Sequence, residues 1–183
     1  MSRGPQTPDL GAVLDEHLAG EFERQDLHAT MRTMSPNPYL NHVPVMAGGY
    51  GRDEVERFYR LHFIAKWPPD TSFQLISRTV GDDQVVDEVI VSFSHDLEMD
   101  ALLPGVPPTG RHVRLPHVVV VFEDGKVAHE HIYWDQASLL VQVGLLDPAG
   151  LPVTGGEQAD RPLDPSLPSN RLMTRPRPGA PPG

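Results

Sequence analysis

Ionisable and aromatic side chains are concentrated in one segment near the end of the folded part of the chain, "AHEHIYWDQ" (residues 128–136). Along a β-strand, side chains alternate between two faces, so Glu130, Ile132 and Trp134 share one face. A carboxylate between Ile and Trp loses hydration of its charged form, which raises its pKa. Such a group is suited to general acid or base catalysis. The competing interpretation is a Glu130 that faces solvent or pairs with an arginine.

A second segment, "VVDEVIVSFSHD" (residues 85–96), repeats this pattern around Glu88. If Glu88 and Glu130 both face inward, repulsion between them would separate their titrations, and one site would hold both an acid and a base. A salt bridge between Glu88 and Arg78 is the alternative. His95 lies at the end of this strand, where an unpaired histidine titrates near neutrality and could relay protons.

Four further residues belong to the predicted site. Asp135 precedes "QASLLVQVG" and is the expected N-cap of a helix, which contributes about 1 kcal/mol, with direct catalysis as a second role. His42 lies in the loop "NHVPVMAGG", which could fold over a cavity mouth or simply pack. Tyr59 and Trp134 are expected to shape the pocket together with His42. The predicted catalytic residues are therefore Glu88, His95, Glu130 and Asp135.

Other classes of active site find less support in the sequence. His129 and His131 share a strand face and could ligate one ion, but no third ligand stands at a known spacing. There is no Gly-x-Ser-x-Gly elbow, no Gly-x-Gly-x-x-Gly and no phosphate loop. The chain contains no cysteine, which excludes a thiolate nucleophile, disulfides and Cys-ligated zinc. We predict no metal and no cofactor.

The amino-acid composition restricts the classes of binding partner and the cellular location that we expect. The formal net charge of −10 argues against nucleic acid and against anionic membrane surfaces, because both need basic residues. No apolar run approaches 18 residues, so no transmembrane helix is expected, and the start of the chain has no apolar signal-peptide core. The absence of cysteine favours a reducing cytoplasm.

The surrounding elements indicate how these residues are positioned. We expect a helix from Asp9 to about residue 34, a second helix after Asp53, and a short last helix after Asp135. Strands are expected at residues 72–81, 85–96, 111–123 and 126–135. Residues 1–8 read as a flexible leader and residues 148–183, with nine of the twenty prolines, as a disordered tail.

This order of elements predicts one α+β domain at residues 9–147, a cone in which helices pack on the concave face of a curved antiparallel sheet. The mouth of such a cone is a favoured ligand site.

The last hairpin and helix carry a resemblance to a known family. The run "FEDGKVAHEHIYWDQASLLVQVGLLD" (residues 122–147) resembles the closing hairpin and helix of SnoaL-like proteins. These form the polyketide-cyclase branch of the nuclear transport factor 2-like superfamily. "PGVPPTGRHV" (residues 104–113) and "GGYGRDEVERFY" (residues 48–59) are similar to the family's turn before the third strand and its second-helix entry. The resemblance implies the same α+β cone, often dimeric through the outer face of the sheet.

The resemblance also implies where catalytic groups would lie. In the family's cyclases a His on the third strand and an Asp on the fourth do the acid-base work. An alignment on Asp124-Gly125-Lys126 places Val118 and Ile132 at these positions, so we expect both to contact substrate. The ionisable groups are then Glu88, His95 and Glu130 instead. The Asp-Arg-Asp relay of the family's epoxide hydrolases cannot be placed.

Together these features predict a soluble, cytoplasmic, homodimeric, cofactor-independent enzyme. Its substrate would be a small, largely apolar carbonyl or lactone compound, and its reaction an isomerisation, cyclisation or elimination (lyase or dehydratase type) by acid-base chemistry next to the carbonyl. The alternative is a non-catalytic small-molecule-binding protein of the same fold.

Overall fold

The computed structural model describes residues 9–175, apart from the side chains of residues 118–121. The α-helices are α1 (Leu10–Leu18), α2 (Leu27–Thr33), α3 (Arg52–Phe58) and α4 (Gln136–Gln142). Two π-helical turns, η1 (Ala19–Glu23) and η3 (Tyr59–Phe63), extend α1 and α3, and two 3₁₀ turns are η2 (Val43–Val45) and η4 (Gly156–Ala159). The strands are β1 (Met34–His42), β2 (Ala47–Tyr50), β3 (Ser72–Val80), β4 (Gln84–Ser94), β5 (His112–Glu123) and β6 (Lys126–Tyr133).

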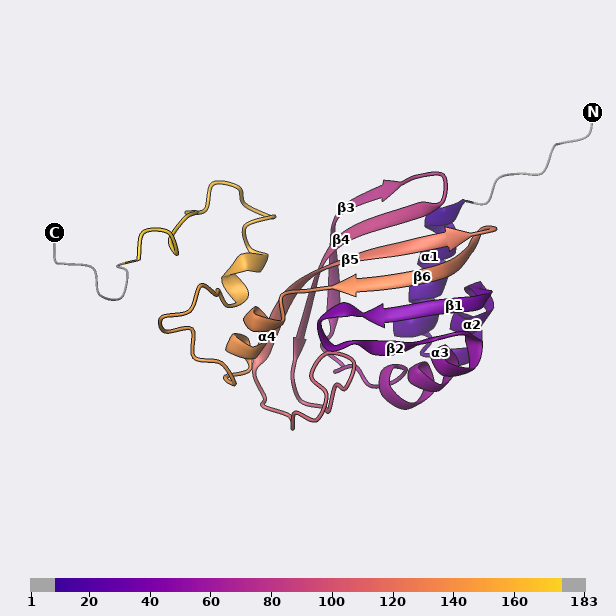
Figure 1. The fold of residues 1–183 in the computed structure, drawn as a ribbon, viewed down its shortest axis with the longest axis horizontal. Helices are drawn as coiled ribbons and strands as arrows, with labels where there is room; N and C mark the ends of the chain where they lie inside the picture. Colours follow the sequence, from indigo (N-terminus) through magenta and orange to yellow (C-terminus); the bar gives the residue numbers. More distant parts are fainter. Residues whose placement is uncertain (1–8, 176–183) are drawn as a thin grey trace, which may run out of the picture.

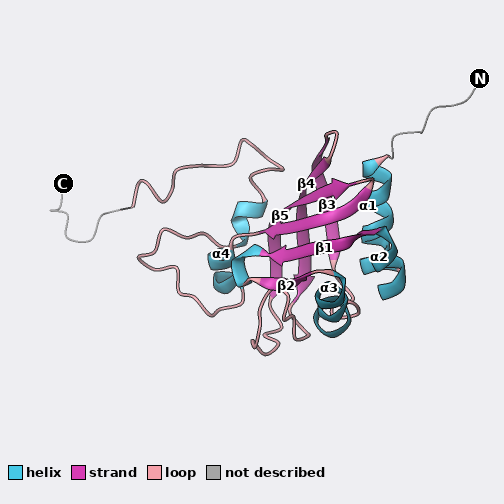
Figure 2. Ribbon diagram, turned by 45° about the vertical axis from the view of Figure 1, so that its right-hand side comes forward, coloured by secondary structure: helices cyan, strands magenta, loops and turns pink. Residues whose placement is uncertain are grey.

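The strands form one curved sheet in the order β2-β1-β6-β5-β4-β3. Neighbouring strands are antiparallel except β1 and β6, which are parallel. Helices α1 and α2 lie behind the sheet in Figure 1, whereas the face toward the viewer carries no helix over β1, β6 and β5. Figure 2 shows α1 and α2 standing together along one side of the sheet. The predicted α+β class, with N-terminal helices packed on a curved sheet, is confirmed.

The structure adds two strands to the four that were predicted. Residues 35–38 were expected to end the first helix and residues 39–51 to be a loop or short extended segment, but residues 34–42 and 47–50 form β1 and β2. Pro36 and Pro38 lack the N–H that a strand ladder uses, which is why this segment does not look like a strand. The register between β1 and β6 shifts between Met34 and Tyr39, so the prolines occupy an irregular stretch of the ladder.

The predicted long first helix is broken. Gln25 adopts a left-handed conformation with φ 50°, and Asp26 then caps α2 by accepting hydrogen bonds from His28 N (2.9 Å) and Ala29 N (3.1 Å). The cap satisfies two of the free N–H groups that a helix start leaves. As a result α2 folds back against α1 instead of continuing it.

The buried apolar residues form two clusters. The first lies between the N-terminal helices and the sheet, around Leu14, Tyr59 and Phe63. The second lies between the other end of the sheet, α4 and the loop of residues 95–111, around Phe93 and Leu139. Burying side chains of this size contributes roughly 1.5–3 kcal/mol each, so both clusters hold the strands that carry the site.

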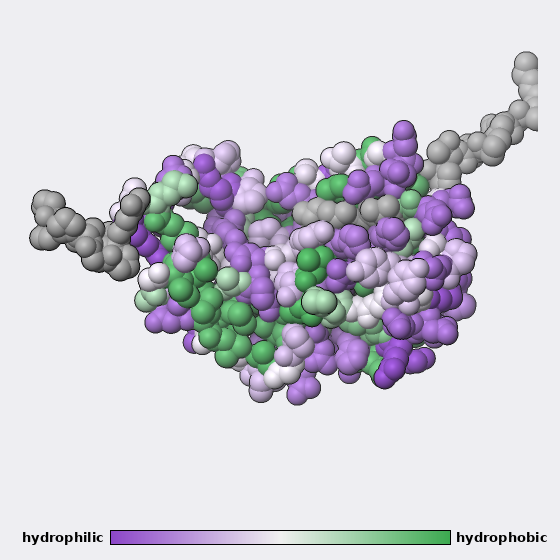
Figure 3. Space-filling model, in the orientation of Figure 1, coloured by the Kyte–Doolittle hydropathy of each residue, from purple (hydrophilic) through white to green (hydrophobic). Residues whose placement is uncertain are grey.

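Part of the predicted disordered tail packs against the domain. The side chain of Ala159 in η4 is fully buried, Arg114 on β5 forms an ion pair with Asp160, and Ser138 Oγ donates a hydrogen bond to Gly155 O (2.8 Å). Leu145 and Leu151 are among the exposed apolar residues. On the face drawn in Figure 3, hydrophobic atoms gather at the lower left. The predicted leader, residues 1–8, and the last residues, 176–183, lie outside the described part of the chain.

None of the helices in the described range combines the length and the apolar character that crossing a membrane requires.

Candidate active site

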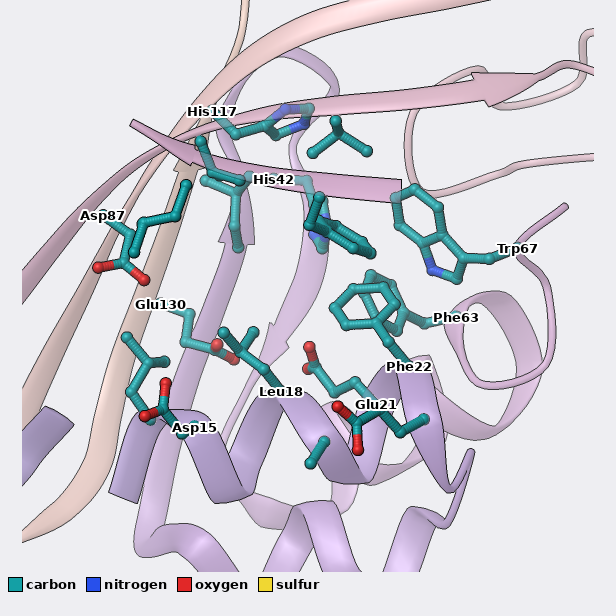
Figure 4. A pocket seen from close by; sticks show the side chains of 18 of the residues that line it. Asp15, Leu18, Glu21, Phe22, His42, Phe63, Trp67, Asp87, His117 and Glu130 are labelled. Atoms are coloured by element: carbon teal, nitrogen blue, oxygen red, sulfur yellow. The ribbon is translucent and has the colours of Figure 1, made fainter. Parts of the chain in front are cut away.

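A cavity of about 500 Å³ lies between the N-terminal helices and the concave face of the sheet (Figure 4). Its wall is largely apolar, with Phe22, Phe63 and Trp67 grouped on one side. The exposed lining residues Phe73 and Leu75, both on the edge strand β3, mark its mouth. A cavity of this size takes a small organic molecule.

Four polar side chains form a buried cluster at one end of this cavity. Nε2 of His17 lies 3.1 Å from Glu21 Oε1 and 3.2 Å from Glu130 Oε1. The hydroxyl of Tyr59 donates a hydrogen bond to Glu130 Oε2 (2.7 Å) and lies 3.3 Å from Nε2 of His17. Each of the four residues is at most 4% exposed. Glu21, Tyr59 and Glu130 line the cavity, so reactive groups are presented to a ligand in a water-poor environment.

Hydrogen bonds behind the cluster decide the protonation of His17. The hydroxyl of Thr33 donates to the carbonyl oxygen of Thr30 (2.6 Å), so it accepts the hydrogen of His17 Nδ1 (2.6 Å). Nε2 faces two carboxyl groups and is held as a second donor. Burial by itself would lower the pKa of His17, but Glu130 and Glu21 outweigh it and raise this pKa well above its usual value.

The pKa values of the two carboxyl groups are shifted in opposite directions. Burial raises the pKa of both, but for Glu130 the His17 charge and the Tyr59 hydroxyl outweigh burial and lower the pKa. For Glu21 burial outweighs the opposing effect of His17, and the pKa is raised. The positive His17 thus favours an ionised Glu130, whereas burial favours the protonated form of Glu21, so the two carboxyl groups are pushed toward the roles of base and acid.

The family model of the SnoaL-like domain matches residues 14–130, about two thirds of the chain. The chain belongs to the SnoaL-like family. The match spans the whole buried cluster, from His17 on α1 to Glu130 on β6.

Solved structures share the fold of this SnoaL-like domain. TsrD from Streptomyces laurentii is 21% identical, with a TM-score of 0.57 over 75% of this chain and 96% of that chain. A proposed SnoaL-like polyketide cyclase from Jannaschia sp. CCS1 is 19% identical (TM-score 0.59; 80% and 99% covered). AclR, a proposed hydroxylase from Streptomyces galilaeus, is 24% identical (TM-score 0.58; 78% and 100% covered). At these identities the likeness concerns the fold. A search of curated proteins finds no match.

π-Helical turns place two of the four cluster residues of the SnoaL-like domain. Glu21 lies in η1, one turn after His17, and Tyr59 begins η3. Such turns are often found at functional sites because they redirect side chains that a regular helix would aim elsewhere. Gly20, next to Glu21, allows α2 to approach η1: a Cβ atom there would lie 3.0 Å from Thr30 N and 3.2 Å from Thr30 Cα.

We expect Gly20→Ala to destabilise the protein by about 1–3 kcal/mol, because the added methyl group meets backbone that must shift. Urea unfolding at neutral pH measures this free energy. Gly81→Ala is the matched control, since its Cβ would meet only Gln84 O at 3.4 Å, and it should stay within about 0.5 kcal/mol. Equal stability of Gly20→Ala and Gly81→Ala would contradict the tight contact.

Two histidines form a second polar region of the cavity wall. His42 on β1 and His117 on β5 line the cavity, and both rings pack against Trp134, with centroids 5.9 Å and 5.5 Å away. Burial lowers the pKa of each ring to about 4, although Glu130 partly opposes this for His42. Both imidazoles are therefore neutral at pH 7 and can take part in neutral hydrogen bonds.

These two histidines predict a loss of stability in acid. A histidine whose folded pKa lies below its unfolded value of about 6.5 contributes stability that is present above that value and is lost as pH falls toward the folded pKa. With folded values of about 4, each contributes roughly 3 kcal/mol. Urea unfolding between pH 7 and pH 4.5 should show a smaller decrease for His117→Phe than for wild type. An unchanged slope would refute the neutral, buried His117.

The structure brings several predicted site residues together. Glu130, His42, Tyr59 and Ile132 all line the cavity. Trp134 lies behind the two histidine rings, and its Nε1 donates to Gln136 Oε1 (2.5 Å). The side chain of Val118 lies outside the described part of the chain.

Glu88 does not lie in this cavity, which corrects the expectation that it shares a pocket with Glu130. Its Oε2 accepts a hydrogen bond from Ser77 (3.2 Å), and the neighbouring Asp87 lines the cavity in its place. The alternation along β4 is regular, because Asp87, Val89 and Val91 all line the cavity. The face that carries Glu88 was taken as the inward one, whereas the opposite and more apolar face is turned to the cavity.

Arg78 pairs with Asp87 and Asp15 instead of Glu88. Its Nε and Nη2 each lie 2.7 Å from a carboxylate oxygen of Asp87, and Nη1 lies 2.8 Å from Asp15 Oδ1. These three residues form an Asp-Arg-Asp arrangement that could not be placed from the sequence. All three line the cavity, with the Asp15 side chain 66% exposed, and they connect α1 to β3 and β4.

His95 and Asp135 have structural contacts and are absent from the cavity wall. His95 is buried, its Nδ1 lies 3.1 Å from Thr109 Oγ1, and its carbonyl accepts from Thr109 N and Gly110 N (3.0 Å each). It anchors the loop before β5. Asp135 caps α4 by accepting from Ser138 N (3.1 Å), as its first predicted role required.

Sequence reasoning missed His17, Glu21 and His117. His17 and Glu21 stand four residues apart on a helical apolar face between Leu14 and Phe22, a spacing that places them together. His117 follows Val113 and Leu115 on the inward face of β5. His117 stands next to Val118, the position where the resemblance placed the family's third-strand histidine, and the β5–β6 register shifts between Val118 and Val120.

The buried cluster is also the place in the described chain where a metal ion could be held. Ligand atoms of His17, Glu21 and Glu130 lie within 4.8 Å of one another. An ion there would compete with the protons described above, since a ligating imidazole nitrogen and carboxylate must be unprotonated. The predicted His129 and His131 pair lies elsewhere, with stacked rings whose centroids are 6.0 Å apart, beside Tyr39.

Proposed function

We propose that this SnoaL-like protein is an enzyme that moves a proton next to the carbonyl of a small, largely apolar substrate, as isomerases, cyclases and dehydratases do. The observation that carries the proposal is the pair of buried carboxyl groups that share His17 Nε2 on the wall of an apolar cavity, with pKa values shifted in opposite directions. Two neighbouring carboxyls whose pKa values are pushed apart are what acid-base catalysis requires.

The chemistry assigns a role to each group. The ionised Glu130 takes the proton from the carbon next to the carbonyl, and the C–H electron pair moves to form the enol double bond. The protonated Glu21 donates its proton to the carbonyl oxygen, so the enol is neutral. The total charge of the cluster is unchanged, because Glu130 gains a proton as Glu21 loses one. His17 and Tyr59 stabilise whichever carboxyl is ionised.

Hydrogen–deuterium exchange on a simple enolisable ketone tests this proposal. We expect the protein to accelerate exchange at the carbon next to the carbonyl of tetralone in deuterated buffer at least about 10²-fold over buffer alone, followed by proton NMR. A chelator should leave the rate unchanged if protons alone do the work. Ketones that bind without any accelerated exchange would favour the alternative, a binding protein of the same fold.

We also propose a homodimer through the open face of the sheet. Tyr50 and Tyr133 on this face are 67% and 48% exposed, and Tyr39 packs its ring against Tyr50 and against His131. Sedimentation velocity tests this proposal. We expect Tyr133→Glu to shift the protein from dimer toward monomer. A sedimentation coefficient equal to that of wild type would count against the proposal.

A further inference from the structure

The hydrogen of His117 is placed by its backbone partner. Nδ1 of His117 lies 3.2 Å from the carbonyl oxygen of Leu115. A carbonyl oxygen only accepts hydrogen bonds, so Nδ1 carries the hydrogen in this contact. Because the buried ring is neutral at pH 7, Nε2 is left with a lone pair. His117 is thus a hydrogen-bond acceptor on its free side.

That free side belongs to the cavity. His117 lines it, and within the described residues Nε2 has no hydrogen-bond partner. Nδ1 of His42 also lacks a hydrogen-bond partner, but this atom is inaccessible to solvent. Nε2 of His117 is not among the inaccessible atoms. Figure 4 shows His117 on the far side of the cavity from Glu21 and Glu130. An unpaired acceptor at this place is satisfied when a ligand brings a donor to it.

The charges around the cavity exclude an anionic ligand. Arg78 is the one Lys or Arg side chain among the described residues that line the cavity, and Asp87 and Asp15 already occupy its guanidinium. Glu21 and Glu130 supply acidic groups at the other end. A carboxylate or phosphate on the ligand would be buried there without a free cation, which is strongly unfavourable.

We propose that the substrate is an uncharged hydroxy-carbonyl compound whose hydroxyl group donates a hydrogen bond to Nε2 of His117 while its carbonyl lies at Glu21 and Glu130. This inference rests on the proposed function, because the carboxyl pair is what places the carbonyl. Recognition at His117 then orients the molecule across the cavity, so that the carbon to be deprotonated faces Glu130.

Three matched tetralones test the inference by calorimetric binding at pH 7. They carry, at the same ring position away from the carbonyl, a hydroxymethyl group, an ethyl group or a carboxylate. We expect the hydroxymethyl compound to bind about fivefold more tightly than the ethyl compound, as one neutral hydrogen bond provides, and the carboxylate to bind most weakly. In His117→Phe the ratio of the affinities of the hydroxymethyl and ethyl compounds should fall to about one, whereas in His42→Phe this ratio should stay at the wild-type value.

Equal affinities of the hydroxymethyl and ethyl compounds for the wild-type protein would overturn the inference, and this comparison needs no variant to fold. A preference that survives in His117→Phe, or that disappears in His42→Phe, would overturn it too. Deuterium exchange on the same ligands separates it from the proposed function. Exchange without a hydroxyl preference removes only the role of His117, and a preference without exchange removes only the acid-base chemistry.

Discussion

Glu130→Gln should lower the rate of hydrogen exchange on tetralone by about 10²–10⁴-fold and leave its affinity within a few-fold of wild type. The glutamine has nearly the same volume, and its amide oxygen can still accept from Tyr59, which contacts Glu130 at 2.7 Å. What is lost is the basic oxygen that takes the proton. Exchange rates by NMR and affinity by calorimetry, on the same ligand, measure the two effects separately.

Glu88→Gln is the matched control, because Glu88 also lies on a strand, β4, but outside the cavity wall. It should exchange tetralone at the wild-type rate. A loss of rate in Glu88→Gln, or equal rates in Glu130→Gln and wild type, would contradict the assignment of the base.

The pH profile of the wild type gives an independent check on the same pair. The lowered pKa of Glu130 keeps it ionised into the acid range, so the rate should decline only below its usual value of about 4.3. Because the pKa of Glu21 is raised, Glu21 loses its proton, and with it the role of general acid, only above that value. A bell-shaped profile should result, and Glu130→Gln should lose its acid limb.

His17→Leu should destabilise the protein by roughly 3–5 kcal/mol at pH 7, because it leaves two buried carboxyl groups without their positive partner. Glu21 Oε1 and Glu130 Oε1 would lose the contacts to Nε2 at 3.1 Å and 3.2 Å. Since the folded pKa of His17 is raised, its contribution is complete below about pH 6.5 and is lost as pH rises through the folded value. Urea unfolding measures the difference from wild type.

The pH dependence of this difference has a definite sign. The difference in unfolding free energy between His17→Leu and wild type should persist from pH 7 to pH 5 and shrink as pH rises through the folded pKa of His17. His62→Leu is the control, because His62 also pairs with a carboxylate, Asp100 (3.0 Å), but its side chain is 43% exposed. An exposed pair contributes about 0–1 kcal/mol. Similar losses in both variants would disprove the special role of the buried cluster.

The sequence by itself determined those features that depend on local pattern. Alternation placed Glu130 and Ile132 on one face, and both line the cavity, because β6 pairs with β1 in unbroken register from Glu130 to Ile132. The four β-branched runs became β3 to β6, and Asp135 caps α4, because side-chain alternation and capping act over only a few residues. The family that the last hairpin and helix resemble is the one whose model matches residues 14–130.

Only the tertiary structure decided the site as a whole. Glu88 was assigned to the cavity, but the opposite face of β4, which carries Asp87, lines it, and alternation alone does not say which face of a strand is turned inward. His17 and Glu21 meet Glu130 more than a hundred residues later in the chain, through a π-helical turn and a backbone approach at Gly20. Protonation of the cluster depends on burial and on distances between these groups, so it is a property of the packed fold rather than of any local pattern.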